Sequence, residues 1–268
     1  MVLDYPKGKF KRMNVALIIT TFNWPNALRL VLLSITQQTK KPDQVIIADD
    51  GSKNETQDVI AEFKRILPII HTWQADKSFR AARSRNLALA KVESPYLILI
   101  DGDCLLPPRF VEGHLKLAEE NKVIAGSRNL LSPHVTKKLL LNASIKELAA
   151  SFSSIKFQRW PVNSFRGLTP SNWKIVRSCN MSLHTDRILN IGGFDESFVG
   201  WGLEDSDCVV RLINAGVEVK NGRFATCVNH LFHHHNTRGH LCNNKRLFQS
   251  SLTEDGLYFA RKTSLEKL

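Results

Sequence analysis

Two carboxylates one residue apart, Asp101 and Asp103, follow the most strand-like stretch of the chain, Tyr96–Ile100. Five apolar residues in a row are typical of a strand that is buried on both faces inside a parallel sheet. Side chains alternate along a strand, so both carboxylates reach one cation only if Gly102 lets the backbone bend. Mg²⁺ is held by one or two carboxylates together with phosphate oxygens of a substrate. Because Asp-Gly is also a common turn pair, a solvated turn is the alternative interpretation.

Two more polar clusters follow predicted strands. Thr20 and Thr21 end a predicted strand over residues 14–21, and Asp49-Asp50-Gly51-Ser52 follows one over residues 44–48. Taken alone, the second cluster is typical of a type I turn with a helix N-cap. Open α/β sheets bind ligands at the carboxyl ends of their strands. Three clusters at one such edge therefore predict a functional site there.

Basic residues lie close to the same predicted edge. Lys77, Arg80, Arg83 and Arg85 lie just before or within a predicted helix over residues 80–92. A solvated helix face is one interpretation of this pattern. Since the helix begins near the acidic edge, a diphosphate held by arginine and a metal is the other.

The second half of the chain carries a further acidic pair. Glu204 and Asp205 begin a predicted helix, where the helix dipole favours acids, so simple capping is one interpretation. Just before them, Trp201 lies between two glycines. Glycines permit close backbone approach, and a Trp face is a common platform for a sugar ring or a base.

Four histidines lie within six positions: His230, His233, His234 and His235. Such density indicates a metal site as readily as a structural role. Cys227, His230, His233 and Cys242 also offer the ligand types of a zinc site, although their spacing is not that of a standard zinc finger.

Strands and helices alternate along the chain, which predicts right-handed crossovers and an α/β fold. A long loop is expected over 158–174. Strands are predicted over 14–21, 44–48, 69–73, 96–100, 122–125 and 177–183, and helices over 25–38, 55–66, 80–92, 107–121, 135–157, 185–191 and from about 204.

The charge balance indicates which classes of partner the chain would bind. Of 268 residues, 37 are Lys or Arg and 25 are Asp or Glu, which gives a net charge of +12. This suits nucleic acid, an anionic membrane surface or a phosphorylated substrate. An acidic edge would repel nucleic acid phosphates unless a metal were present, so no nucleic acid partner is expected. The helical pattern over 135–157 is basic and amphipathic, which fits either contact with an anionic membrane or an ordinary surface helix.

No apolar run approaches the roughly 18 residues of a membrane span, and residues 1–12 lack the apolar core of a signal peptide. The expected location is therefore cytoplasmic, at most peripheral at the inner face of the membrane. The five cysteines are scattered and odd in number, which favours reduced thiols.

Five motifs follow one another along the chain: Thr20-Thr21-Phe22-Asn23, Asp49-Asp50-Gly51-Ser52, Ser84–Leu89, Asp101-Gly102-Asp103 and Asn180-Met181-Ser182. Together they resemble the family 2 glycosyltransferases, whose nucleotide-sugar fold is called GT-A. A later segment, Gly192–Glu196 through Gly200–Asp205, is similar to the acceptor-side segment of galactosyltransferases and chondroitin-type polymerases. The resemblance covers residues 13–240; each motif alone is weak, but the ordered set is strong.

The resemblance implies one GT-A domain, Rossmann-like, with a mixed, mainly parallel central sheet flanked by helices. After a basic arm over residues 1–12 come a nucleotide-sugar-binding half over 13–127 and a variable helical and loop segment over 128–177. Residues 178–268 then form the acceptor-binding half with a C-terminal metal-binding segment.

The resemblance also implies a role for each matching residue. Where the family often has a third acid after the Glu-Asp pair, this chain has Ser206 and then Asp207. Asp205 is the implied catalytic base. The implied metal ligands are Asp103 and one histidine, with His233 the first choice and His230 the second. The other implied contacts are Thr20, Asp49 and Asp50 to the base, Arg80, Arg85, Asp101 and Gly102 to the rest of the nucleotide sugar, and Asn180, Trp201 and Glu204 to the acceptor.

The implied activity is transfer of a sugar, with inversion, from a nucleotide-diphosphate sugar to a hydroxyl of a glycan or glycolipid. A UDP-sugar is the expected donor, Mn²⁺ or Mg²⁺ the expected cofactor, and bacterial surface polysaccharide or lipopolysaccharide synthesis the expected role. The alternatives are a non-catalytic sugar- or nucleotide-binding protein on the same fold and a basic nucleic-acid-binding protein.

Overall fold

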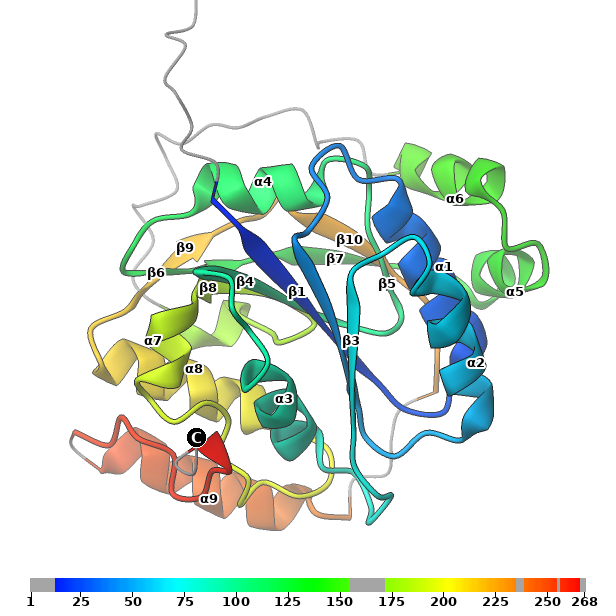
Figure 1. The fold of residues 1–268 in the computed structure, drawn as a ribbon. Coiled ribbons are helices and arrows are strands. Elements are labelled where there is room, and N and C mark those ends of the chain that lie inside the picture. Colours follow the sequence, from blue (N-terminus) through cyan, green and yellow to red (C-terminus); the bar gives the residue numbers. More distant parts are fainter. Residues whose placement is uncertain (1–12, 155–171, 235–238, 255, 266–268) are drawn as a thin grey trace, which may run out of the picture.

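A seven-stranded sheet forms the centre of the molecule (Figure 1). The computed structural model describes residues 13–154, 172–234, 239–254 and 256–265. Within them β8 runs antiparallel to both of its neighbours, and the other strand pairs are parallel. The predicted mixed, mainly parallel α/β fold is therefore confirmed. The strand order is β3 (Ile69–Trp73), β2 (Gln44–Asp49), β1 (Val15–Thr21), β4 (Tyr96–Asp101), β8 (Asn180–His184), β6 (Lys122–Ala125) and β9 (Glu218–Asn221).

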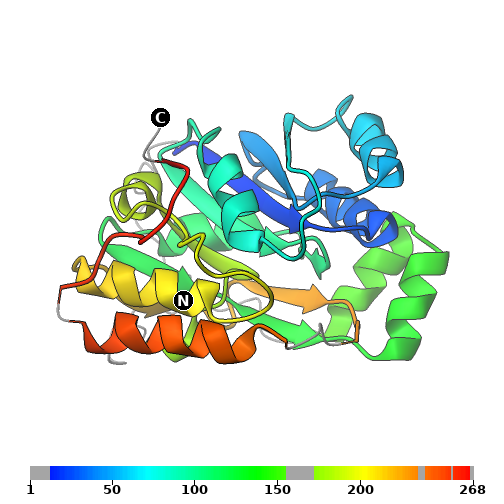
Figure 2. The ribbon, with the colours of Figure 1, turned by 90° about the horizontal axis from the view of Figure 1, so that it is seen from below.

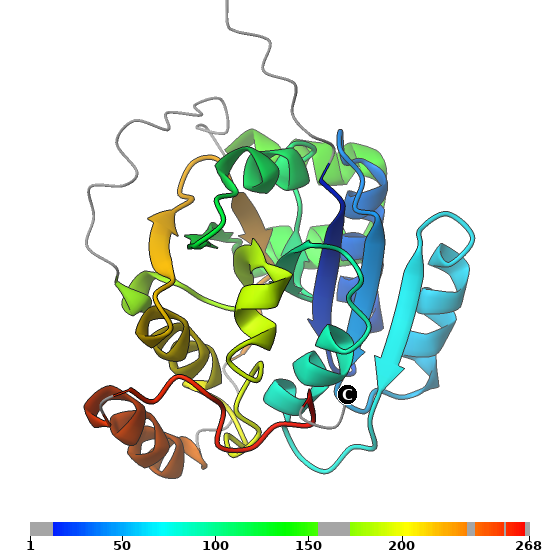
Figure 3. The ribbon, with the colours of Figure 1, turned by 60° about the vertical axis from the view of Figure 1, so that its left-hand side comes forward.

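Helices cover both faces of this sheet. α1 (Pro25–Thr36), α2 (Asn54–Phe63) and α4 (Phe110–Leu117) contribute to the apolar core on one face. α3 (Ala81–Leu89), α7 (Thr185–Leu189) and α8 (Glu204–Asn214) contribute to the core on the other. α9 (Leu241–Thr253) lies alongside α8, on the side away from the sheet (Figures 2 and 3).

The apolar runs of β1 and β4 explain this layering. Alternate residues of β1 contact opposite cores, Leu17 on the α1 side and Ile18 on the α3 side, and both are fully buried. The register places Thr20 beside Asp101 and Thr21 beside Asp49. The polar clusters predicted at one edge of the sheet therefore do share that edge.

A second, three-stranded sheet escaped prediction because its strands are short and lack alternating apolar residues. β10 (Cys227–His230) pairs with β5 (Cys104–Leu105) on one side and with β7 (Ser127–Leu130) on the other. β10 contains the first member of the histidine cluster. β9 and α9 were also not predicted.

The predicted helix over 135–157 is in fact two helices, α5 (Pro133–Leu141) and α6 (Ile145–Ser151), followed by the short 3₁₀ turn η1 (Phe152–Ser154). Ser132 and Ser144 cap them by accepting backbone N–H groups, and the second cap starts a new helix within the predicted one. Among the residues described, no helix has both the length and the apolar character needed to cross a membrane.

Helix and strand ends differ from prediction by a few residues. The helix predicted over 107–121 is α4, which begins only after Pro107 and Pro108. The strand predicted from 177 is β8, which begins at Asn180, after the 3₁₀ turn η3 (Trp173–Ile175). The predicted basic arm over 1–12 and most of the predicted loop over 158–174 lie outside the described residues.

Candidate metal and transfer site

Asp103, His230 and His233 converge at the carboxyl edge of the central sheet. Their ligand atoms lie within 4.8 Å of one another. Asp103 Oδ2 lies 3.3 Å from His233 Nε2, and Asp103 Oδ1 lies 3.6 Å from His230 Nε2. The second sheet causes this convergence, because β10 pairs His230 with Cys104 and the Leu231 N–H donates to the Asp103 carbonyl at 3.0 Å.

Hydrogen bonds orient both imidazole rings toward the carboxylate. His230 Nδ1 donates to the Leu231 carbonyl, and His233 Nδ1 donates to the His234 carbonyl, each at 2.8 Å. In the neutral rings this leaves the Nε2 lone pairs facing the oxygens of Asp103. Metal-binding histidines usually donate their second N–H in this way, so the three side chains fit a divalent cation.

The alternative zinc site does not form. Among the described residues, the cluster of converging ligands consists of Asp103, His230 and His233 and includes neither Cys227 nor Cys242. Cys227 is partly buried on β10 and Cys242 is exposed on α9.

Gly102 allows the two acids of the turn to approach β1. Its N–H donates to the Thr20 carbonyl at 2.7 Å, and a Cβ atom there would lie 3.0 Å from Thr21 Oγ1. Burial raises the pKa of Asp101, the neighbouring Arg85 lowers it, and the charges of Asp103 and Asp205 raise it again. These three carboxylates therefore share one local field.

Arg85 joins the two halves of the protein. From α3, its side chain donates to Thr20 Oγ1 at 3.0 Å, to Glu204 Oε1 at 3.1 Å and to Asp101 Oδ1 at 3.4 Å. Burial lowers the pKa of Arg85, but the charges of Glu204 and Asp101 outweigh this effect and raise it, so the side chain stays charged. Arg85 thereby fixes the start of α8 beside the ends of β1 and β4.

Asp205 lies in the first turn of α8 and is partly exposed. Its Oδ1 accepts the Ser206 N–H at 2.7 Å, and its Oδ2 accepts the Ser178 N–H at 3.4 Å. The preceding Glu204 is buried, where burial and the charge of Asp205 raise its pKa against the lowering effect of Arg85. The structure thus places Asp205 at the surface of the site and Glu204 behind it.

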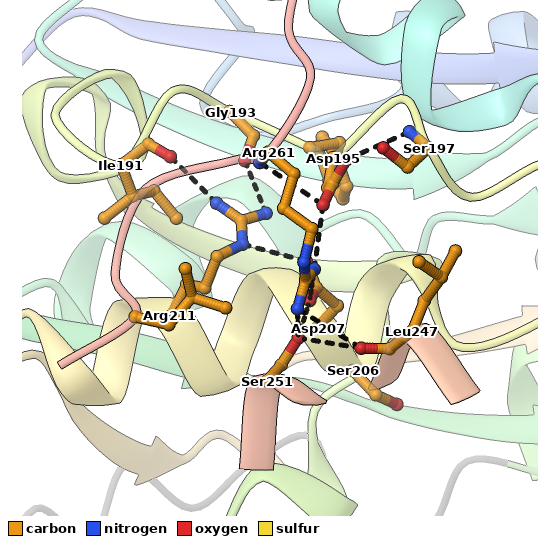
Figure 4. Close-up of polar contacts among 12 residues, drawn as sticks. Ile191, Gly193, Asp195, Ser197, Ser206, Asp207, Arg211, Leu247, Ser251 and Arg261 are labelled. Atoms are coloured by element: carbon orange, nitrogen blue, oxygen red, sulfur yellow. Dashed lines mark hydrogen bonds and ion pairs between the residues drawn. The ribbon is translucent and has the colours of Figure 1, made fainter. Parts of the chain in front are cut away.

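Asp207 does not replace the missing third acid in the site. It is fully buried and bonds Arg211 Nε at 2.8 Å and Ser251 of α9 at 2.5 Å. Arg261 lies 2.9 Å from Asp195 and 3.5 Å from Asp207 (Figure 4). This buried network ties α8, α9 and the Gly192–Asp195 turn together, because Arg211 also donates to the Gly193 carbonyl at 2.9 Å.

The acids after β2 are occupied by protein donors. Asp49 is fully buried and accepts the Ser52 N–H at 2.8 Å and lies 3.0 Å from His71 Nε2. Asp50 accepts the Arg80 N–H at 2.7 Å. Burial raises the pKa of Asp50, although this backbone hydrogen bond lowers it. These hydrogen bonds shape the strand ends where the nucleotide is expected. The contacts of Asp49, Asp50 and Arg80 with a nucleotide stay predictions.

α9 holds the loop that carries Trp201. The buried Asn244 donates to the carbonyls of Val199 at 3.1 Å and Gly202 at 3.0 Å. Gly200 has a φ of +76° and leaves no room for a side chain, since its Cβ would lie 2.6 Å from His240 Cβ. Trp201 itself is 39% exposed. The sequence signal for α9 is weak, because two of its three buried residues, Asn244 and Ser251, are polar.

Asn180 is buried at the start of β8, and protein partners occupy its side-chain amide. Its Nδ2 donates to the carbonyls of Ser127 and Thr226 at 2.8 Å and 2.6 Å, and its Oδ1 lies 3.0 Å from His114 Nε2. It is 2% exposed. Asn180 also borders an open cavity at the ends of β6 and β9, but an acceptor could bond this amide only if these hydrogen bonds opened.

The chain matches two protein-family models in succession. Residues 16–170 match glycosyl transferase family 2, and residues 167–235 match the N-terminal domain of galactosyltransferase. A chondroitin synthase from Escherichia coli is 26% identical over 233 residues, which is 80% of this chain and 34% of the synthase. The chain thus spans about a third of the length of that relative.

Two solved structures share the fold. The mannosyltransferase PcManGT from Pyrobaculum calidifontis, in complex with GDP-Man and Mn²⁺, superposes with a TM-score of 0.59 at 15% identity, covering 91% of this chain and 63% of that one. S. aureus TarS 1–349, in complex with UDP, gives a TM-score of 0.60 at 13% identity, covering 91% and 66%. The glycosyl transferase family 2 model matches more than half of the residues of this chain, and the chain therefore belongs to that family.

Proposed function

We propose that this glycosyltransferase moves a sugar, with inversion, from a UDP-sugar to a hydroxyl of a glycan or glycolipid acceptor. The observation that carries the proposal is the convergence of Asp103, His230 and His233 at the carboxyl edge of the sheet. Open α/β sheets bind ligands at this edge. Asp205 follows Glu204 on α8, and Arg85 bonds both Glu204 and Asp101, which brings the start of α8 to the same edge.

The donor belongs on the β1–β2 side of this site. Thr20, Asp49 and Asp50 lie at the ends of these two strands, and Arg80 begins α3 above them. We assign the base to the strand ends and the diphosphate to Arg80 and the turn around Asp101. The complex of TarS with UDP supports a uridine nucleotide.

A divalent cation bound by Asp103, His233 and His230 would stabilise the negative charge of the leaving diphosphate as a Lewis acid. Mg²⁺ prefers oxygen ligands, whereas two imidazoles beside one carboxylate suit a transition-metal ion. The ligand set therefore favours Mn²⁺ over Mg²⁺. The Mn²⁺ in the PcManGT complex supports this choice.

Asp205 is the proposed general base. A hydroxyl becomes a good nucleophile only when its proton is removed, and a carboxylate within hydrogen-bond reach can remove it. Attack from the face opposite the leaving diphosphate inverts the anomeric centre. Trp201 offers its exposed ring to the acceptor sugar. Glu204, bound to Arg85, holds the helix that presents Asp205, and we assign it a contact with the acceptor.

The proposed biological role and location are based on similarity to a known synthase and on the net charge. Similarity to a chondroitin synthase supports a glycan acceptor, and we propose a role in bacterial surface polysaccharide or lipopolysaccharide synthesis. With its net charge of +12, the protein would work in the cytoplasm, in peripheral contact with the inner face of the membrane.

Screening a panel of nucleotide sugars for slow hydrolysis with Mn²⁺ tests the proposal. We expect one UDP-sugar to be hydrolysed, EDTA to stop the reaction, and added Mn²⁺ to restore it. Asp103→Ala should abolish hydrolysis and weaken UDP binding in Mn²⁺, while Asp58→Ala, which changes an exposed acid of α2, should do neither. Full activity in EDTA would refute the metal site.

A further inference from the structure

An open cavity of about 320 Å³ lies beside the transfer site, on the side away from the β1–β2 strands. It is bordered by the ends of β6 and β9, which pair at Ala125 and Asn221, and by the start of β8. In the sheet, β8 alone separates β6 from β4. The cavity therefore opens at the same carboxyl edge as Asp101, and its volume is at the lower end of the ~300–1,000 Å³ of small-molecule sites.

Four cationic side chains line this cavity: Arg128, Lys174, Arg177 and Arg223. All four are exposed, and none of the described residues that line the cavity is Asp or Glu. Within the described part of the chain, no carboxylate forms an ion pair with Arg128, Lys174 or Arg177. Four like charges around one hollow repel one another, and a cavity with charges of one sign attracts ligands of the other.

The cavity lies next to the proposed base, because Ser178, which bonds Asp205, lies between the lining residues Arg177 and Cys179. Cys179 lines it and lies 3.8 Å from Arg128 Nη1. Cys104, on the strand that pairs with β10, donates its S–H to Asp103 Oδ1 at 3.6 Å. The Ser178 N–H donates to Asp205 at 3.4 Å. An acceptor whose hydroxyl meets Asp205 would thus extend its neighbouring groups into this cavity.

We propose that this cavity binds an anionic group, a carboxylate or a phosphate, carried by the acceptor sugar next to the reacting hydroxyl. The inference rests on the proposed function, because it assigns the cavity to the acceptor. Arg128 and Arg177 are the selecting side chains, since their guanidinium groups can bind either anion through paired hydrogen bonds. A neutral acceptor would leave these charges without a partner.

Three glycosides that differ at one carbon test the proposal: methyl β-glucuronide, methyl β-glucoside 6-phosphate and methyl β-glucoside. Binding of each to the full chain, with UDP and Mn²⁺ present, is measured by thermophoresis. We expect at least one anionic glycoside to bind about tenfold or more tighter than the neutral one, and their ratio identifies the preferred anion. Equal binding of all three, or no binding of any, would overturn the inference.

Paired variants give the control. Arg128→Gln with Arg177→Gln should remove about tenfold or more of the preference for the anionic glycoside. Lys137→Gln with Lys146→Gln, which removes the same charge from exposed positions on α5 and α6, should leave it unchanged. An equal loss in both pairs would show general charge attraction instead. Failure of UDP to bind refutes the proposed function, whereas UDP binding without anion preference refutes only this inference.

Discussion

Asp205 occupies the first helical turn of α8, a position where capping acids and catalytic bases both occur. Its two carboxylate oxygens accept backbone N–H groups of Ser206 and Ser178. A carboxylate held by two donors is oriented but can still accept a third hydrogen bond. Position and hydrogen bonds therefore leave both roles open, and only a variant that keeps the shape and removes the basicity distinguishes them.

Asp205→Asn should lower turnover by roughly two to four orders of magnitude if Asp205 is the base, with Tm and UDP affinity almost unchanged. If it only caps α8, the loss of stability should stay well under ~1 kcal/mol and turnover should remain nearly native. Steady-state transfer measured beside a thermal melt decides between them. Glu204→Gln provides the contrast, because losing its charge removes a buried partner of Arg85 and should lower Tm.

His233 and His230 differ in ways that their variants should reveal. The His233 side chain is 37% exposed, against 11% for His230. His233→Ala should raise the Mn²⁺ concentration needed for UDP binding and leave Tm nearly unchanged. His230→Ala should have the same effect on Mn²⁺ and also lower Tm, since it empties a buried position on β10. If Mn²⁺ dependence changes only in His230→Ala, His233 is not a ligand.

At the scale of elements, sequence patterns predicted the central sheet well and the second sheet not at all. Buried parallel strands such as β1 and β4 carry a strong apolar signal, and their ends carry Thr20, Asp101 and Asp103. β5 and β10 have two and four residues, and such short strands are set by tertiary pairing. Sequence patterns could thus single out Asp103 and the histidine cluster as candidate ligands, but not the elements that bring them together.

A chain of buried hydrogen bonds joins β4 and β8 to α4. Tyr96 lies 2.8 Å from Ser182 Oγ, which lies 2.7 Å from His114 Nδ1, and His114 Nε2 lies 3.0 Å from Asn180 Oδ1. Burial lowers the pKa of His114 from 6.5 to about 3, although the hydrogen bond to Asn180 raises it. His114 is therefore neutral in the folded protein.

This histidine should make stability depend on pH. Below pH 6.5 the unfolded chain binds a proton at His114 that the folded protein does not, so the free energy of unfolding should fall as pH falls toward about 3. The contribution is complete above pH 6.5 and declines by about 1.4 kcal/mol per pH unit below it. Urea unfolding across this range should show a shallower slope for His114→Gln than for the native chain. Equal slopes would show that His114 is charged when folded.

For the whole molecule, the net charge of +12 predicts attraction to anionic membranes. Lys137 and Lys146 are exposed on α5 and α6 and lie within the basic segment. Binding to vesicles with acidic lipids should weaken sharply as salt rises, because exposed charges are screened beyond ~10 Å at 0.1 M. Vesicle flotation at low and high salt measures this. Binding that salt does not affect, or no binding, would leave the charge without this explanation.

The buried network around Asp207 has a consequence for biosynthesis. A chain emerges from the ribosome in sequence order, so β1 through β4 are exposed for folding well before Ser251 and Arg261. Those two residues complete the contacts that fix α8, which carries Asp205. A nascent chain should therefore complete the proposed nucleotide and metal site, whose last residue is His233, before α8 is fixed in place. A chain that ends at Thr253, and so lacks Arg261, should still bind UDP but should transfer no sugar.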